Sequence, residues 1–128
     1  MTGTMGERFA RALAAKDFEE ITSLLHPHVD FRGMTPGTFW QATSVGEVVG
    51  RILPSWFEES DRVDRLLSIE TDQVGDAQRV GYRFAVSNAD GGFIVDQQAY
   101  YKTADEVITW MRVLCSGWRR PQDTGTPA

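Results

Sequence analysis

The chain has 128 residues, of which 41% are hydrophobic and 24% are charged. That size and balance are typical of a single folded domain with a sizeable core. The 18 acidic and 13 basic residues give a formal net charge of −5. The basic residues are scattered and cannot neutralise a row of phosphates, so we expect no nucleic-acid partner. No apolar run approaches the roughly 18 residues that span a membrane, and no leader pattern opens the chain, so we expect a cytoplasmic protein.

Cys115 is the only cysteine, which excludes an intramolecular disulfide and a thiolate metal cage. Its setting in the segment VLCSG is typical of a small buried side chain, and we expect an unreactive thiol. His26, His28 and Asp30 alternate along an extended segment. Three candidate ligands at a helix exit fall short of a structural metal site, so we expect neither a metal nor a cofactor.

Three helix patterns occupy the first half of the chain. The first begins at Thr4 and the third at Ser44, each followed three residues later by Glu in the capping-box spacing. The second begins at Asp17, again with Glu three residues on, and ends before Pro27. Pro54 interrupts the apolar stripe of the third helix, so we expect a kink or an end near Leu53.

Strand patterns fill most of the remaining sequence. A short strand around Phe31 is followed by a Pro-Gly turn signal, and from Val63 onward the apolar period changes to two. Short turns rich in Gly, Asp and Asn join the later strands as hairpins. Residues 119–128 lack apolar periodicity, so we expect one domain over 1–118 and a flexible tail over 119–128. The four later strands run through Leu67 and Ile69, Tyr82 to Val86, Phe93 to Tyr101, and Val107 to Cys115.

The element order, together with the segments LLHPHVDFRGMTPGTFW and VDQQAYYKTADEVITWMRVLCSG, resembles the nuclear transport factor 2-like superfamily. Within it, the chain resembles the SnoaL-like polyketide cyclase and bacterial ketosteroid isomerase group, from Met5 to about Trp118. The resemblance implies an α+β fold in which a curved antiparallel sheet wraps three N-terminal helices as a cone. The open mouth of such a cone is a pocket for small, mostly apolar molecules. Isomerases, dehydratases, cyclases, epoxide hydrolases and binding proteins share this fold, so it implies no single reaction.

Two positions depart from the isomerase pattern. The resemblance places Gly33 where those enzymes carry a carboxylate base, and Gln98 where they carry a protonated carboxylic acid in the oxyanion hole. Gln98 can donate a hydrogen bond, but glycine accepts no proton. Epoxide hydrolases of this fold take a catalytic acid from the last strand. In this chain the expected inward row of that strand holds no acidic residue. Steroid isomerisation and epoxide hydrolysis are therefore disfavoured. That row is Met111, Val113 and Cys115.

The candidate site lies on the strand from Phe93 to Tyr101. Asp96, Gln98 and Tyr100 follow Ile94 at period-two spacing and share one face of this strand. If that face is inward, Asp96 is the candidate acid or base, and Tyr100 or Tyr82 polarises a carbonyl group. The alternative is a solvated or ion-paired Asp96 on the outer face. The two alternatives differ by a register shift of one residue, which exchanges the two faces of the strand.

The remaining pocket residues follow from the same inward rows and from the aromatic supply. Trp40 and Trp56 are expected to form pocket walls, because Trp40 lies on the segment that enters the third helix and Trp56 lies on that helix. The full expected ligand-binding set is Phe31, Trp40, Trp56, Tyr82, Phe84, Gln98, Met111, Val113 and Cys115, with Asp96 and Tyr100 as the catalytic candidates.

Trp110 and Arg112 have the opposite parity to Met111, and we expect them on the outer sheet face. Gln97, Ala99 and Tyr101 are expected beside them, on a surface amphipathic enough to pair with a second copy of the chain.

Two functional hypotheses follow from the resemblance and the candidate row. In the first, a SnoaL-like pocket protein acts as a cofactor-independent isomerase, cyclase or dehydratase on an apolar carbonyl compound. In the second, it is a non-catalytic binding or dimeric accessory protein, which Gly33 and Gln98 both favour.

Overall fold

The computed structural model describes residues 4–121. Helices occupy the first part of the chain and long strands the second, as the sequence predicts. The elements are α1 (Met5–Ala14), α2 (Phe18–Leu24), β1 (Leu25–Thr35), β2 (Thr38–Ala42), α3 (Val45–Glu47), the π-helical η1 (Val48–Ile52), α4 (Leu53–Trp56), β3 (Arg62–Val74), β4 (Ala77–Asn88), β5 (Gly91–Ala104) and β6 (Val107–Cys115).

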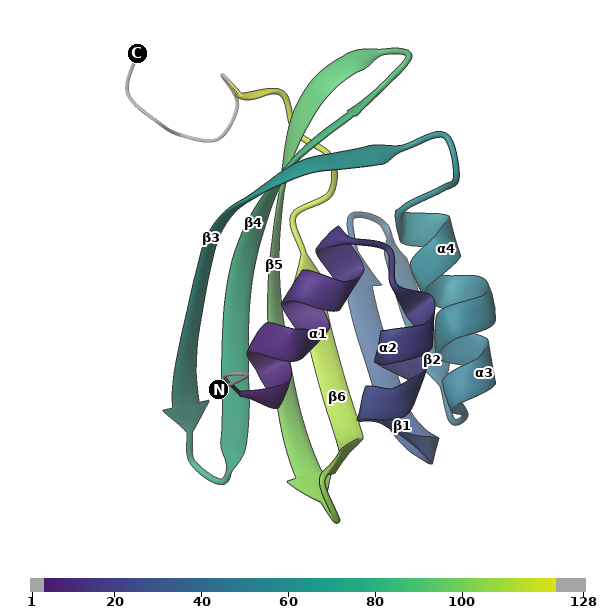
Figure 1. The fold of residues 1–128 in the computed structure, drawn as a ribbon, viewed down its shortest axis with the longest axis vertical. Helices are drawn as coiled ribbons and strands as arrows, with labels where there is room; N and C mark the ends of the chain where they lie inside the picture. Colours follow the sequence, from purple (N-terminus) through teal and green to yellow (C-terminus); the bar gives the residue numbers. More distant parts are fainter. Residues whose placement is uncertain (1–3, 122–128) are drawn as a thin grey trace.

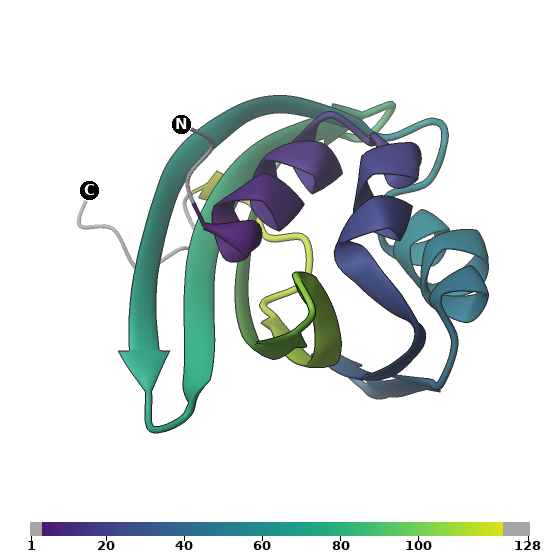
Figure 2. The same ribbon diagram turned by 60° about the horizontal axis from the view of Figure 1, so that its bottom comes forward.

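The strands form one six-stranded sheet in the order β2-β1-β6-β5-β4-β3. The β1–β6 pair is parallel and every other pair of neighbours is antiparallel, so the sheet is mixed. Figure 2 shows the sheet bending around α1, while α2 and the α3–α4 segment lie beside β1 and β2 (Figures 1 and 2). The expected α+β fold, a curved sheet around N-terminal helices, is confirmed.

Helix α1 is fixed to the sheet at its first turn. The capping box expected at Thr4 is present, with Glu7 N donating to Thr4 Oγ1 at 3.1 Å. Gly6 N donates to the Tyr101 hydroxyl at 2.9 Å, which satisfies one of the helix's free N–H groups. A Cβ at Gly6 would lie 2.7 Å from that hydroxyl. Only glycine therefore allows α1 to approach β5 this closely.

The third helix does not end at Pro54. Because proline has no N–H and its ring crowds the preceding turn, the backbone widens into the π-helical turn η1 before continuing as α4 to Trp56. The sequence predicts a kink or an end near Leu53, and the widened turn is how the chain accommodates this proline. The continued helix carries Trp56 to the concave side of the sheet.

Register between β5 and β6 decides which row of β5 faces the helices. Cys115 pairs with Gln97, and Met111 pairs with Tyr101. Register partners point to the same face, and Met111 and Cys115 are both buried. The inward row of β5 is therefore Val95, Gln97, Ala99 and Tyr101, all at most 2% exposed. The prediction that Ile94, Asp96, Gln98 and Tyr100 face inward is wrong by one residue, as is the placement of Gln97, Ala99 and Tyr101 on the outer face.

Strand pairing continues just past the expected domain boundary at Trp118. Arg119 and Ile94 exchange two backbone hydrogen bonds, of 2.7 and 3.0 Å. Residues 122–128 of the expected tail lie outside the described residues. In the part of the chain that the structure describes, no helix is long and apolar enough to cross a membrane.

Candidate ligand-binding pocket

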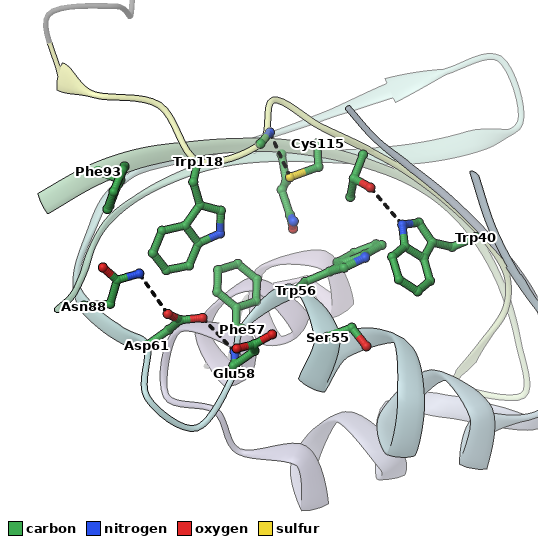
Figure 3. Close-up of a pocket in the computed structure, with 13 residues that line it drawn as sticks. Trp40, Ser55, Trp56, Phe57, Glu58, Asp61, Asn88, Phe93, Cys115 and Trp118 are labelled. Atoms are coloured by element: carbon green, nitrogen blue, oxygen red, sulfur yellow. Dashed lines mark hydrogen bonds between the residues drawn. The ribbon is translucent and has the colours of Figure 1, made fainter. Parts of the chain in front are cut away.

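A cavity of about 400 Å³ opens between α4, the segment that follows it, and the concave face of the sheet. Figure 3 shows its lining side chains. They come from β1, β2, α4 and the segment after it, the end of β4, β5, and the end of β6 with the segment that follows it. The lining residues are Thr35, Trp40, Ser55, Trp56, Phe57, Glu58, Asp61, Asn88, Phe93, Gln97, Cys115, Gly117 and Trp118.

Five aromatic rings form most of the wall. Trp40 meets Trp56 edge to face, with ring centroids 6.3 Å apart. Trp118 stands between Phe57 and Phe93, with centroid distances of 6.2 and 5.4 Å. Tilted and edge-to-face pairs of this kind bury large apolar areas in a defined geometry. The wall therefore suits a flat or bulky apolar ligand.

Trp56 lies against the position where the resemblance places a catalytic base. A Cβ at Gly33 would lie 2.7 Å from a ring carbon of Trp56, closer than carbon atoms approach in proteins. Any side chain at this position would displace the indole. Gly33 thus leaves room for the Trp56 ring at the position where the resemblance places the carboxylate base of the isomerases.

Gln97 and Tyr82 form a buried polar pair below the cavity. The Tyr82 hydroxyl donates to Gln97 Oε1 at 2.6 Å, and the two residues are 3% and 2% exposed. Burial, and to a lesser extent the neighbouring Cys115, raise the pKa of Tyr82 well above its usual value. The hydroxyl therefore stays protonated and keeps donating to Gln97.

Two buried N–H donors of the wall have no partner among residues 4–121. They are Trp56 Nε1 and Gln97 Nε2. By contrast, the indole N–H of Trp40 on the same wall is satisfied, because Trp40 Nε1 donates to Thr35 Oγ1 at 2.8 Å. An unpaired buried donor costs about 1–3 kcal/mol, so each such group calls for an explanation.

The Cys115 thiol is a neutral part of the wall. Burial is the main reason that its pKa is raised, the Asp96 charge acts in the same direction, and the Gln97 amide and the Gly117 N–H oppose them. Gly117 N donates to Cys115 Sγ at 3.3 Å. Gln97 Nε2 is near enough to influence the thiol's pKa but forms no hydrogen bond with it. A raised pKa keeps the sulfur protonated and makes it a poor nucleophile.

Two carboxylates line the cavity, Glu58 and Asp61, and both come from the segment between α4 and β3. Asp61 Oδ2 accepts from Glu58 N at 2.9 Å, and Asp61 Oδ1 accepts from Asn88 Nδ2 at 3.1 Å. Lys16 Nζ donates to the backbone carbonyls of Glu58 and Asp61 and so fixes the segment to the α1–α2 connection. Asp61 is therefore a carboxylate held in one place at the cavity edge.

The expected catalytic residues lie outside this cavity. Asp96 is on the outer face, where its carboxylate pairs with Arg83 at 2.7 Å and raises the pKa of that guanidinium. Gln98 accepts from Arg79 Nη1 at 3.0 Å on the same face. Tyr100 lines a shallow outer hollow beside Arg112. These three placements were wrong because they depended on the inverted row of β5.

The other expected pocket residues divide into two groups. Trp40, Trp56 and Cys115 line the cavity. The remaining ones are buried in the core beneath it and are not lining residues: Phe31, Tyr82, Phe84, Met111 and Val113.

Several lining residues escaped the sequence reasoning. Gln97 and Phe93 could have been found from the composition of their row, which is the more apolar of the two rows of this strand. Asp61, Asn88 and Trp118 lie in or next to connections, where alternation gives no signal. Among residues 4–121, no three His, Cys, Asp or Glu side chains gather as a metal site would need.

A curved sheet wrapped around N-terminal helices, with an aromatic-walled cavity at its mouth, is the nuclear transport factor 2-like fold. Solved structures share it. A protein described as an isomerase from Rhodopseudomonas palustris has a TM-score of 0.68 and 19% identity, over 91% of this chain and 93% of that one. A protein described as a polyketide cyclase from Xanthomonas campestris has a TM-score of 0.67 and 15% identity, over 86% of each chain.

A third structure was solved with a small molecule. It is a protein with a ketosteroid isomerase-like fold from Catenulispora acidiphila, in complex with trimethylamine, with a TM-score of 0.67 and 14% identity over 99% of this chain and 96% of that one. No family model and no curated protein sequence matches this chain. At these identities the comparisons establish the fold.

Proposed function

We propose that the protein binds a small, largely apolar molecule in this cavity through a hydrogen-bond acceptor such as a carbonyl oxygen. The observation that carries the proposal is the pair of buried, unpartnered donors, Trp56 Nε1 and Gln97 Nε2, on an aromatic wall. A ligand acceptor would relieve the cost of about 1–3 kcal/mol that each unpaired donor imposes. The aromatic rings supply the apolar contact, as in most small-molecule pockets.

Acid/base turnover of the bound carbonyl compound, as in an isomerase, cyclase or dehydratase, is the second candidate. Asp61 favours it, because a carboxylate stands on the wall of a cavity that also holds N–H donors for a developing oxyanion. Asp61 would take a proton from the carbon beside the carbonyl group. Binding alone ranks first because both Asp61 oxygens already accept hydrogen bonds, which leaves them less free to take a proton.

The test uses para-neopentylacetophenone, an apolar methyl ketone, as the probe. In the ¹⁵N-labelled protein we expect its binding to shift the indole N–H signal of Trp56 and the side-chain amide signal of Gln97. Trp56→Phe keeps an aromatic ring but removes the donor, so the probe should bind about five- to ten-fold more weakly. Trp110→Phe, on the outer face, is the matched control and should leave the affinity unchanged. Equal affinity in both variants would contradict the proposal.

Catalysis is tested with the same probe in deuterated water. If Asp61 removes a proton beside the carbonyl group, the proton signal of the acetyl methyl group should disappear faster with the protein than without it, because deuterium replaces those protons. Asp61→Asn should abolish the acceleration and retain binding. A ketone that binds without faster exchange leaves the protein in the non-catalytic class.

We also propose that the outer sheet face pairs with a second copy of the chain. Met34, Phe39 and Leu114 are 50%, 61% and 54% exposed, and Met34 is the register partner of both other residues. They therefore form one apolar row across β2, β1 and β6. Asp96 and Glu70, on the β3–β5 half of the same face, are ion-paired with Arg83 and Arg79, so the apolar row carries the proposal. A two-fold axis can place this row against its own copy.

A further inference from the structure

The charges of the cavity are of one sign. Glu58 and Asp61 are acidic, and the thirteen lining residues include no Arg, Lys or His. Two basic groups lie next to this lining: Lys16 Nζ donates to the backbone carbonyls of Glu58 and Asp61, and the Arg120 guanidinium lies over the Phe93 ring. Asp61 is half-buried, so solvent screens its charge less than that of the exposed Glu58. The carboxylates on the lining therefore favour a cationic ligand over an anionic one.

The aromatic rings are grouped beside these acids. Trp118 contacts two other rings of the wall, with its ring centroid 6.2 Å from that of Phe57 and 5.4 Å from that of Phe93. In Figure 3, Trp118, Phe93 and Asp61 lie on one side of the cavity and Trp40 lies on the other. The faces of aromatic rings attract alkylammonium groups, and clusters of such rings are the usual binding sites for methylated ammonium ions. The Phe93 ring already has a cation over it, with the Arg120 guanidinium carbon 4.3 Å from its centroid.

From these features we infer that the ligand carries a positively charged organic group, such as a protonated tertiary amine or a quaternary ammonium, at the Asp61 end of the cavity. The inference rests on the proposed function, because it concerns the same cavity. Gln97 lines the same cavity, is 2% exposed and has an amide N–H without a partner among residues 4–121, which independently indicates a ligand with an acceptor and leaves the charge of that ligand to Asp61 and the rings. The inferred ligand therefore has three parts: an apolar body, an acceptor that binds the unpaired N–H donors, and a positively charged group that contacts Asp61 and the aromatic rings.

Asp61 is suited to this role by its fixed geometry. Both of its oxygens are oriented by N–H donors, from Glu58 and Asn88, at 2.9 and 3.1 Å. Each carboxylate oxygen has further acceptor capacity beyond one hydrogen bond. The negative charge is therefore in place before the ligand arrives, and binding costs little reorganisation.

The experiment compares two ligands of the same shape that differ in charge. Para-(trimethylammoniomethyl)acetophenone carries a quaternary nitrogen where para-neopentylacetophenone carries a carbon atom, and a methylene group separates that position from the ring in both. We expect calorimetry at low ionic strength to give a Kd about ten-fold lower for the cation. At high salt the ratio should shrink.

Two variants test whether the preference for the cation depends on Asp61. Asp61→Asn keeps the shape of the side chain and an oxygen for the Glu58 N–H, and it should reduce the preference for the cation to about three-fold or less. Asp105→Asn removes one negative charge from the β5–β6 turn, at the other end of β5, and should leave the preference unchanged. Asparagine tolerates the positive φ of 53° at that position. Far-ultraviolet circular dichroism checks that both variants are folded.

The outcomes separate this inference from the proposed function. If the neutral ketone binds as tightly as the cation or tighter, the cation inference is wrong and the proposed binding function stands. If the cation is preferred equally in Asp61→Asn, its site lies elsewhere and the inference is also overturned. If neither compound binds the wild-type chain, both proposals fail.

Discussion

The buried pair of Tyr82 and Gln97 allows a quantitative test of how the pocket floor is held. Tyr82→Phe removes only the hydroxyl, which donates to Gln97 Oε1 at 2.6 Å. Gln97 is 2% exposed, so its carbonyl oxygen is largely removed from bulk water when this donor is lost. The variant leaves an unsatisfied carbonyl oxygen beside the Nε2 group, which has no partner among residues 4–121 either.

The expected cost follows from these contacts. A buried acceptor without a partner costs about 1–3 kcal/mol, so Tyr82→Phe should lower the free energy of unfolding by about 2 kcal/mol. For a chain of this length, that corresponds to a fall in Tm of roughly 6–8 °C. Gln97→Met leaves the Tyr82 hydroxyl unpaired but also removes the unpartnered Nε2, so its cost should be smaller, about 1 kcal/mol.

The double variant provides the decisive comparison. With both polar groups gone, the pair becomes an apolar contact of similar shape, and Tyr82→Phe/Gln97→Met should be less destabilised than the sum of the single variants by about 1–2 kcal/mol. Urea unfolding followed by tryptophan fluorescence gives the four free energies. Strict additivity of the two substitutions would refute the idea that the pair acts as one hydrogen-bonded unit.

Alkaline stability should depend on the two buried groups whose pKa values are raised, Tyr82 and Cys115. Both stay protonated in the folded chain, whereas unfolding lets them ionise near their usual pKa values of 10.0 and 9.0. The free energy of unfolding should therefore be independent of these groups below about pH 8 and fall above it, by up to about 1.4 kcal/mol per pH unit for each group. Urea titrations from pH 7 to 11 should show a shallower fall for Cys115→Ala, and an equal slope in that variant would contradict the assignment. At the outer face, Phe39→Lys should convert the proposed dimer to a monomer in sedimentation experiments, while Asp105→Asn should not, and a wild-type monomer at high concentration would exclude the pairing.

Local sequence signals were sufficient for the helices and for most strands. The capping spacing at Thr4 and the Asp17 cap have the predicted geometry, because a cap involves only residues within one helical turn. The inward rows of β4 and β6 were readable because one face of each strand is almost purely apolar. Tyr82, Phe84 and Met111 are accordingly buried. Turn residues located the hairpins for the same reason, since their conformational needs are local.

Strand β5 is where the sequence prediction failed. One row holds a single amide, Gln97, among apolar and aromatic residues, whereas the other holds Asp96, Gln98 and Lys102, so alternation favours the Gln97 row although the candidate acid lies on the other one. Pairing with β6 places the Gln97 row inward, because Gln97 lies opposite the inward Cys115. A slip of one residue exchanges the faces of an entire strand. That single step moved the expected acid out of the pocket and brought an amide in.

The pocket itself was decided by the tertiary structure. The sequence indicated a third amphipathic helix whose apolar stripe includes Trp56, with a kink or an end near Leu53, and a last strand with Cys115 on its inner row. Asp61 lies between α4 and β3, Asn88 ends β4, and Trp118 follows β6, and no period or spacing links these three residues. Curvature of the sheet and anchoring of the segment after α4 by Lys16 bring them to one cavity, because contacts between distant segments depend on the packed fold rather than on neighbouring residues.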